Sequence, residues 1–345
     1  MKRLRVEAQI TGCQCACDHC LTYGKHTKEY MSLDEIELIL NNMKEYSEIG
    51  HFFPLFDVTN HPEFIKILKL SNDYGYKRDT LSTNGVYEIS DNELKFMKEF
   101  GIKDIQLAFH GLNETHDSFV HYKGVFKKLI SLIKKASSQG FKFWNILFIN
   151  NKNISEIIEV IRILKSLGIS EKDFIVTTYM YQGRAMKLEE LYFTRKQMKE
   201  VELIYPIIPR ERYSESEWMN KVKRDDKWNK PAFQLQRDKL ELHIDSNFDV
   251  YFQNMNPYYF KGIKKSKEGF KLGNLKLEKL NKIIQKAERE RPPLIRLLEN
   301  ITIKELGKKL EKELEEKNDI LYTHNDILYK WPYEFLKSVT NENSV

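Results

Sequence analysis

The stretch "TGCQCACDHCLTYG", residues 11–24, contains all four cysteines of the 345-residue chain, which are Cys13, Cys15, Cys17 and Cys20. Structural zinc sites usually take two cysteine pairs separated by a longer loop, and no second pair exists here. A redox Cys-x-x-Cys motif is possible at Cys17 and Cys20, but thioredoxin-like motifs follow a different pattern. The spacing Cys13-x3-Cys17-x2-Cys20 fits a cubane iron–sulfur cluster, which thiolates hold at short, fixed spacing. Three ligands would leave one iron open to a substrate or cofactor.

The cysteine stretch lies between an expected strand and a helix that opens with a capping box, Ser32 and Glu35. This strand–helix order repeats six times over residues 1–205. The expected strands cover residues 4–10, 52–58, 77–85, 104–111, 141–151 and 173–183. Such alternation predicts a parallel α/β sheet, and six units fit a partial (β/α)6 TIM-like barrel better than a closed eightfold one. Chemistry in such folds sits on loops at the carboxyl ends of the strands, where the cysteines are expected.

The motif Cys-x3-Cys-x-aromatic-Cys after the first strand resembles the radical S-adenosylmethionine (radical SAM) superfamily, with His19 at the aromatic position. The resemblance implies that Cys13, Cys17 and Cys20 hold one [4Fe-4S] cluster and that Cys15 does not. Members bind S-adenosylmethionine (SAM) on the open iron and split it with one electron. The resulting 5′-deoxyadenosyl radical takes a hydrogen atom from a C–H bond. The resemblance also implies an external one-electron donor of the flavodoxin or ferredoxin type.

Four further stretches resemble the family at the expected strand ends: "STNG" (82–85), "FHGLNETHD" (109–117), "NILFINNKN" (145–153) and "YQGRA" (181–185). The family often carries Gly-Gly-Glu-Pro after the second strand, whereas this chain has "FDVTNHPEF" (56–64), with Asp57 in place of the glutamate. A carboxylate there can accept from the SAM ammonium group. The resemblance implies the following SAM contacts: His19, Asp57, Thr59, Ser82, Asn84, Gln106, His110, Asn145, Gly183 and Arg184.

Several of these residues have alternative interpretations. Gln106, His110 and Asn145 lie on the polar phase of their strands or at strand ends, so we expect them at the barrel mouth. His110 could equally be a structural histidine. Asp57 could be a surface loop acid, and Arg184 could cap a surface instead of pairing with the SAM carboxylate. The sequence marks out no catalytic residue.

Residues 206–230 are polar and aromatic without a clear period, and they predict a linker to a C-terminal region, 231–345. There, "LELHIDSNFDVYFQN" (240–254) predicts a β-hairpin, and mostly helical sequence follows. This layout is similar to the SPASM or twitch extension of peptide-modifying family members, which binds further clusters through cysteines. The C-terminal region has no cysteine, so we expect it to build no cluster and only to close the open side of the barrel. It could also be a helical appendage that merely resembles the extension.

The composition favours a protein without a membrane span, since no apolar run is long enough for one, and the basic N-terminus lacks the apolar core of a signal peptide. We therefore expect a cytoplasmic protein. The net charge of +6 comes from interleaved charges. It fits an acidic substrate and gives little support to nucleic-acid binding.

Three functional hypotheses follow. The SPASM-like layout favours a ribosomally synthesised peptide as substrate. Because the first strand begins at once and leaves no N-terminal leader-binding domain, such a peptide would dock on the C-terminal region or on a partner protein. The second hypothesis is rearrangement or oxidation of a small metabolite, such as a sugar, an amino acid or an antibiotic intermediate. The third is a non-catalytic module that binds an iron–sulfur cluster or zinc.

Overall fold

The structure is a computed structural model that describes residues 3–24, 29–76, 78–204, 211–235, 239–311 and 320–342. A four-stranded parallel sheet has the order β3-β4-β5-β6, and a five-stranded sheet has the order β10-β9-β8-β1-β2. The longer strands are β1 (Arg3–Ala8), β2 (Gly50–Pro54), β3 (Thr80–Ser82), β4 (Asp104–Phe109), β5 (Lys142–Phe148), β6 (Phe174–Thr177), β8 (Lys239–Ile244) and β9 (Asp249–Phe252). The two-residue strands are β7 (Arg212–Tyr213), β10 (Gly273–Asn274) and β11 (Tyr322–Thr323), and β7 pairs with β11.

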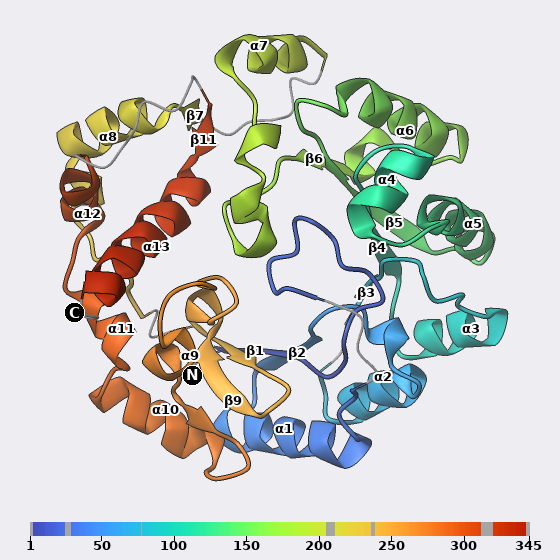
Figure 1. The fold of residues 1–345 in the computed structure, drawn as a ribbon. Coiled ribbons are helices and arrows are strands. Elements are labelled where there is room, and N and C mark those ends of the chain that lie inside the picture. Colours follow the sequence, from blue (N-terminus) through green and yellow to red (C-terminus); the bar gives the residue numbers. More distant parts are fainter. Residues whose placement is uncertain are drawn as a thin grey trace.

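The helices form an outer ring around the strands (Figure 1). Helices α1 (Leu33–Tyr46) and α3 (Asp91–Glu99) begin at the capping boxes predicted at Ser32 and Ser90. The others are α2 (Phe64–Asp73), α4 (Asn113–Val120), α5 (Val125–Ser138), α6 (Ile154–Ser166), α7 (Arg195–Ile204), α8 (Glu215–Arg224), α9 (Ser266–Phe270), α10 (Leu280–Arg289), α11 (Pro293–Glu299), α12 (Ile303–Leu310) and α13 (His324–Glu342).

The six predicted strand–helix units are confirmed in order, and they build a partial barrel that remains open inside. Alternate residues of β3, β4 and β5 face the helices, and those in register at Leu81, Ile105 and Phe143 are buried. On the opposite, inner face, Trp144 is 40% exposed and Ile175 on β6 is 46% exposed. A closed barrel would bury this face, so the exposure indicates an accessible interior.

The predicted hairpin is also confirmed, as β8 and β9 pair antiparallel with Leu242 opposite Phe252. The other edge of β8 pairs in parallel with β1, which the sequence does not predict. The pairing continues one buried row of side chains across the two strands, with Leu4 beside Leu240 and Val6 beside Leu242. The C-terminal region therefore shares a sheet with the first strand, and the chain has no clean division between the two regions.

The predicted linker is wrong for its described part, residues 211–230. Helix α8 occupies most of it and begins at a capping box of Ser214 and Glu217. Its Trp218, Met219 and Val222 are buried, and the Trp218 indole N–H donates to the Tyr322 carbonyl at 2.8 Å. The tertiary contacts of one apolar face thus order a segment whose sequence is mostly charged. Residues 206–210 lie outside the described part.

Helix α13 is tied to the barrel by a buried ion pair. The Lys330 ammonium lies 2.7 Å from a carboxylate oxygen of Glu189 and 3.1 Å from one of Glu215. Glu189 follows β6 and Glu215 begins α8, so a single cation joins three separate parts of the chain. Within the described ranges, no helix combines the length and the apolar character that crossing a bilayer requires.

Candidate functional site

The four cysteines lie on the loop that follows β1, residues 9–24, which we call the cysteine loop. It covers the centre of the ring of strands and helices (Figure 1, dark blue). Cys13, Cys17 and Cys20 are half-buried, whereas Cys15 is 1% exposed and packs within the hydrophobic core. Burial therefore separates one thiol from the other three, along the same division that the sequence motif predicts.

The end of α4 holds one side of the cysteine loop. The backbone N–H groups of Ala16 and Asp18 donate to the carbonyls of Val120 and Phe119, each at 3.1 Å. The Asp18 carboxylate also meets the His121 ring at 2.6 Å. Both backbone bonds flank Cys17, so the segment after β4 fixes the height of that cysteine above the strands.

Arg184, after β6, holds the other side of the loop. Its backbone N–H donates to the Cys20 carbonyl at 3.0 Å, and its guanidinium donates to the Cys17 carbonyl at 2.9 Å and to the Gly24 carbonyl. The planar guanidinium fork can serve two acceptors at fixed geometry. One residue thus fixes the backbone at two of the three half-buried cysteines.

Gly183 permits this close approach. Its φ of +58° lies in the left-handed region, and a Cβ placed there would stand 2.3 Å from the Leu21 carbonyl oxygen. The Tyr23 hydroxyl donates to the Gly183 carbonyl at 3.0 Å. The loops after β1 and β6 are therefore in backbone-to-backbone contact that a larger residue would disrupt.

The half-buried thiols receive hydrogen bonds from the protein. The Gly24 N–H donates to the Cys20 sulfur at 3.0 Å, and the Asn84 amide donates to the Cys13 sulfur at 3.6 Å. A hydrogen bond from the Cys15 thiol lowers the pKa of Cys13, whereas burial raises the pKa of Cys20. N–H donors of this kind stabilise thiolates and tune the potentials of iron–sulfur clusters.

The chemistry of these thiols fits an iron–sulfur cluster, but their spacing in the structure does not. The donor set consists of three half-buried sulfurs on one anchored loop. Among the residues that the structure describes, however, no three His, Cys, Asp or Glu side chains stand close enough together to hold a metal ion. The sulfurs would have to converge on a cluster from their present positions.

An aromatic stack lies against the cysteine loop. The His19 ring is 4.4 Å from that of His110, which stacks between Phe119 and Phe148 at 4.4 and 4.9 Å, and Tyr179 stacks on both phenylalanines. Burial lowers the pKa of His19 to about 3 and holds that of His110 well below its ordinary value. Both rings are therefore neutral near pH 7. Their Nδ1 atoms have no hydrogen-bond partner among the described residues.

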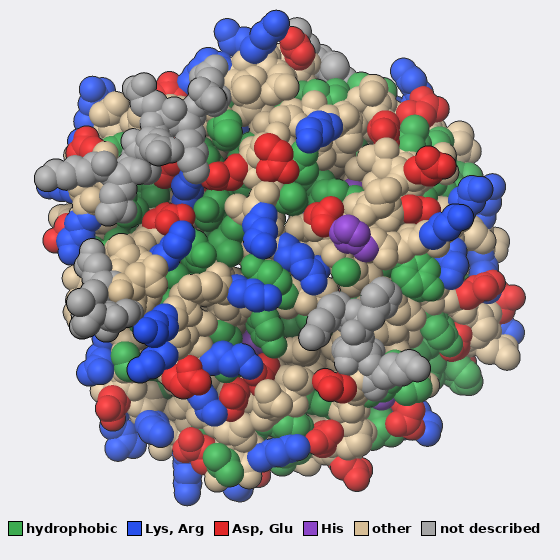
Figure 2. All heavy atoms as spheres, in the orientation of Figure 1, with side chains coloured by type: hydrophobic (Ala, Val, Ile, Leu, Met, Phe, Trp, Pro, Cys, Tyr) green, Lys and Arg blue, Asp and Glu red, His purple; other side chains and the backbone are tan. Residues whose placement is uncertain are grey.

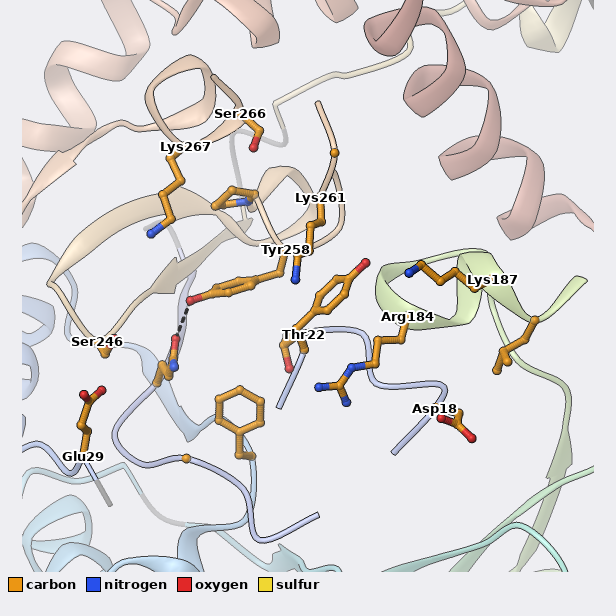
Figure 3. A pocket seen from close by; sticks show the side chains of 17 residues that line it. Asp18, Thr22, Glu29, Arg184, Lys187, Ser246, Tyr258, Lys261, Ser266 and Lys267 are labelled. Carbon is orange, nitrogen blue, oxygen red and sulfur yellow. Dashed lines mark hydrogen bonds between the residues drawn. The ribbon is translucent and has the colours of Figure 1, made fainter. Parts of the chain in front are cut away.

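A pocket of about 720 Å³ opens beside the cysteine loop (Figure 3). The loop forms one wall, residues 184–188 after β6 form the second, and residues 246–267 of the C-terminal region form the third. Tyr23 and Phe56 line the pocket. Their backbone φ angles are 56° and 63°, values that residues other than glycine rarely adopt. Such strained residues are concentrated at functional sites in proteins.

Residues 9–164 match the sequence model of the radical SAM superfamily. The matched region begins at the cysteine loop and extends into α6. It contains the three half-buried thiols, both stacked histidines and the end of α4 that anchors the loop. Residues 9–164 are a radical SAM domain. Membership implies a [4Fe-4S] cluster and SAM as cofactors.

Curated relatives match a similar share of the chain. GTP 3′,8-cyclase of Aquifex aeolicus (strain VF5) is 29% identical over 169 residues, which are 46% of this chain and 51% of that protein. The sporulation killing factor maturation protein SkfB of Bacillus subtilis (strain 168) is 24% identical over 167 residues, 46% of this chain and 39% of that protein. The chain thus spans about half the length, or less, of these relatives.

A solved structure extends the likeness beyond the radical SAM domain. SuiB of Streptococcus suis, in its crystal structure bound to precursor peptide SuiA, superposes with a TM-score of 0.57 at 13% identity. The match covers 85% of this chain and 66% of that one. At this identity the likeness establishes the fold, and it supports the partial barrel described above.

Within the radical SAM domain, the Asp57 carboxylate accepts hydrogen bonds from other residues of the protein. The residue is 4% exposed, and its carboxylate accepts from the backbone and hydroxyl of Thr59, the hydroxyl of Thr83 and the backbone of Asn84, at 2.7–3.0 Å. Burial raises the pKa of Asp57, whereas these donors favour its ionised form. A carboxylate offers about four acceptor positions, and four donors occupy them here. The surface-acid alternative is wrong. These four donors would compete with the SAM ammonium group, whose contact with Asp57 stays a prediction.

The other predicted contacts from the second to fourth strands fall into two groups. Thr59 and Asn84 belong to the Asp57 network, and Asn84 also reaches the Cys13 sulfur. Ser82 and Gln106 lie in register on the inner barrel face and hydrogen-bond to each other at 3.2 Å. Gln106 thus faces the barrel as predicted, and contact of either residue with SAM stays a prediction.

Asn145 does not lie where the sequence predicts. It shares its face of β5 with buried Phe143 and Leu147, and it is in register with buried Leu107 on β4. That face is covered by helices, so Asn145 points away from the barrel interior. Asn145 is a polar residue within an apolar row. From the sequence, its polarity predicts the barrel-facing side of β5, which is the wrong side.

Arg184 and Gly183 lie in the expected segment after β6. The Arg184 guanidinium donates to backbone carbonyls of the cysteine loop and also lines the pocket. It therefore holds the loop in place instead of merely capping a surface. Binding of the SAM carboxylate by its remaining N–H groups stays a prediction.

Sequence reasoning missed several residues of the site. Thr83 bonds Asp57, although the quoted "STNG" contains it, and Tyr23 bonds Gly183 although it lies in the cysteine stretch. Glu7 lies on the open face of β1, accepts from Gln253 at 2.7 Å, and has its pKa raised by burial. The alternation of Arg5, Glu7 and Gln9 with apolar residues could have indicated a polar inner face.

Proposed function

We propose that the chain is a radical SAM enzyme in which Cys13, Cys17 and Cys20 hold one [4Fe-4S] cluster and Cys15 stays a buried structural thiol. The supporting observation is the division of the four thiols, three half-buried on an anchored loop and one within the core. When bound, the cluster and SAM supply abstraction of a hydrogen atom from a C–H bond. Arg184, Gly183 and the end of α4 keep the loop in place for that purpose.

The aromatic stack and the inner barrel face would receive SAM. The unpartnered Nδ1 atoms of His19 and His110 can bond polar groups of a nucleoside, and the neutral His19 ring can stack on its base. Ser82 and Gln106 can meet hydroxyl or carboxylate groups on the same face. The buried rings also exclude water from that part of the site, which protects reactive species.

We propose a peptide as the substrate. The pocket is open to solvent beside the cysteine loop, and its third wall comes from the C-terminal region. The fold resembles that of SuiB, whose crystal structure contains a precursor peptide, and the relative SkfB is named as a maturation protein. A segment of a few residues would fill a volume of about 720 Å³.

A small metabolite is the second candidate, and the pocket volume favours it as well, since small-molecule sites commonly measure about 300–1,000 Å³. The relative named GTP 3′,8-cyclase, which matches 46% of this chain, supports this candidate. The two candidates differ in whether the substrate extends beyond the pocket.

Anaerobic reconstitution with iron and sulfide tests the cofactor assignment. With a reductant and SAM, the wild type should form 5′-deoxyadenosine. Cys17→Ala should lose the cluster absorbance and SAM cleavage, whereas Cys15→Ala should keep both because the latter thiol lies in the core. A protein that binds iron and sulfide but never yields 5′-deoxyadenosine would be an iron–sulfur module, and the proposal would be wrong. Binding of zinc alone would have the same consequence.

Deuterium transfer tests the substrate class. Labelled peptides and labelled small metabolites are supplied separately, and deuterium in 5′-deoxyadenosine is measured by mass spectrometry. Transfer from a peptide and not from metabolites supports the first candidate. Transfer from a metabolite alone would replace it with the second.

A further inference from the structure

The pocket beside the cysteine loop has a basic wall, which we define as Lys187, Lys261 and Lys267. Figure 3 shows Lys187 and Arg184 on one side of the pocket and Lys261 and Lys267 on the other. Figure 2 shows basic side chains gathered around the hollow at the centre of this face. The three lysines come from two regions separated by more than 70 positions of sequence.

The amines of the basic wall are not neutralised by nearby acids. Among the described residues, no carboxylate oxygen lies within 4.0 Å of any of the three Nζ atoms. Two acids, Asp18 and Glu29, also line the pocket, and Asp18 is already paired with His121. The cations therefore exceed the available anions, and the pocket has a positive potential.

The chain holds part of this wall in position. The Lys261 ammonium lies 4.1 Å from the centre of the Tyr23 ring, a cation–π contact that places it over the cysteine loop. The Lys261 carbonyl accepts from the Tyr333 hydroxyl at 3.2 Å, and Gly262 follows with a φ of +100°. The turn that brings Lys261 to the pocket is thus fixed by α13 before any ligand arrives, which lowers the cost of binding.

We propose that Lys187, Lys261 and Lys267 bind anionic groups of the substrate, either side-chain carboxylates of an acidic peptide segment or phosphates of a small molecule. This rests on the proposed function and names the chemistry of the substrate that it leaves open. A single carboxylate, such as that of SAM, needs one or two cations. Lysines on two sides of a pocket of about 720 Å³ suit a ligand with several negative charges.

Direct binding measurements test the proposal on the reconstituted protein with SAM and without reductant. The first probe is a fluorescein-labelled twelve-residue peptide rich in glutamate, compared with the same peptide carrying glutamine at each glutamate. The second probe is inorganic tripolyphosphate, used as a competitor and alone by calorimetry. Each titration is run at low and high salt, because screening weakens exposed charge pairs.

The test variant carries Lys187→Gln, Lys261→Gln and Lys267→Gln together. The matched control carries Lys282→Gln, Lys286→Gln and Lys308→Gln, which removes the same charge from exposed positions of α10 and α12. We expect the test variant to weaken binding about tenfold and to flatten its salt dependence. The control should bind as the wild type does, and the near-ultraviolet circular dichroism of both variants should match that of the wild type.

The outcomes separate the two sources of charge. Binding of the glutamate peptide supports a peptide substrate, and binding of tripolyphosphate alone supports a phosphorylated small molecule. The proposal is overturned if neither probe binds, if the glutamine peptide binds equally well, or if both triple variants bind alike. Because no reductant is present, these results stand independently of 5′-deoxyadenosine formation, which tests the proposed function.

Discussion

The guanidinium of Arg184 donates to the main-chain carbonyl of Cys17 at 2.9 Å, and the two residues are 167 positions apart. The bond connects the segment after β6 to the cysteine loop after β1. The backbone N–H of the same arginine holds Cys20. Two proposed cluster ligands are therefore held by one residue that is not itself a ligand, Cys17 through its side chain and Cys20 through its backbone.

Replacing this arginine should weaken the cluster. Arg184→Lys keeps the charge but loses the planar fork, so the carbonyls of Cys17 and Gly24 cannot both be held. Changes outside the ligand set commonly lower metal affinity by about tenfold or more. The measurement is iron and sulfide per chain after limited reconstitution, followed by loss of absorbance to a chelator. Arg162→Lys, on the exposed surface of α6, is the control, and equal loss rates in both variants would contradict the assignment.

Two glycines allow a matched test of the contact between loops. Gly75 and Gly183 both have positive φ, but a Cβ at Gly75 meets nothing within 4 Å, whereas one at Gly183 meets the Leu21 carbonyl oxygen at 2.3 Å. Gly75→Ala should cost only backbone strain, about 1 kcal/mol of unfolding free energy. Gly183→Ala should cost more than that and also lower the bound iron. Urea unfolding and iron analysis measure both effects, and similar losses in both variants would show that the contact is unimportant.

Removing the buried cation of α13, Lys330, should lower the free energy of unfolding strongly. Lys330→Met leaves Glu189 and Glu215 without their shared ammonium, and breaking a buried pair in this way costs about 3–5 kcal/mol. Lys69→Met breaks the exposed pair with Asp73 and should cost less than about 1 kcal/mol. Thermal or urea unfolding gives both values. A small loss for Lys330→Met would mean that water already reaches the two carboxylates.

Buried histidines, among them His110, His116 and His243, predict how stability depends on pH. Burial lowers the pKa of His116 and of His243 to about 4, and it holds the pKa of His110 well below its ordinary value. The unfolded chain binds protons at these rings below about pH 6.5 while the folded chain does not. The unfolded state therefore gains protons as the pH falls, and folding loses stability.

The expected size follows from this linkage. Between pH 6.5 and 5.5 each of the three rings should cost about 1 kcal/mol of unfolding free energy. His243→Gln removes one titrating group, and its two buried nitrogens have no partner among the described residues, so the substitution should reduce the loss between these pH values by about 1 kcal/mol. Urea midpoints at both pH values provide the check. An unchanged slope in the variant would mean that His243 is protonated in the folded chain.

Local sequence rules predicted the parts of the fold that depend on local chemistry. The boxes at Ser32 and Ser90 set the starts of α1 and α3, and the hairpin around Asp245 formed as expected. Helix α8 escaped prediction because only Trp218, Met219 and Val222 form its apolar face, and their burial depends on distant partners. The pairing of β8 with β1 could not be predicted either, because the alternation of polar and apolar residues along a strand does not indicate which strand lies beside it.

The site shows the same limit. The sequence alone indicated the cysteine motif and the polar residues near the ends of strands. The role of Asp57 depends on Thr83 and Asn84 arriving from another strand, and that of Lys261 on a turn fixed by Tyr333. Asn145 was misassigned because a single polar residue on a strand does not reveal which face is covered.

The parallel pairing of β1 with β8 has a consequence for how the chain is made. Strand β1 leaves the ribosome long before its second neighbour, β8, which ends at Ile244. Until then β1 has an unpaired edge, and closing a loop of this length makes folding slow. An open edge of this kind is a template for aggregation. Expression of residues 1–230 alone should therefore yield aggregated protein, although that fragment contains every cysteine.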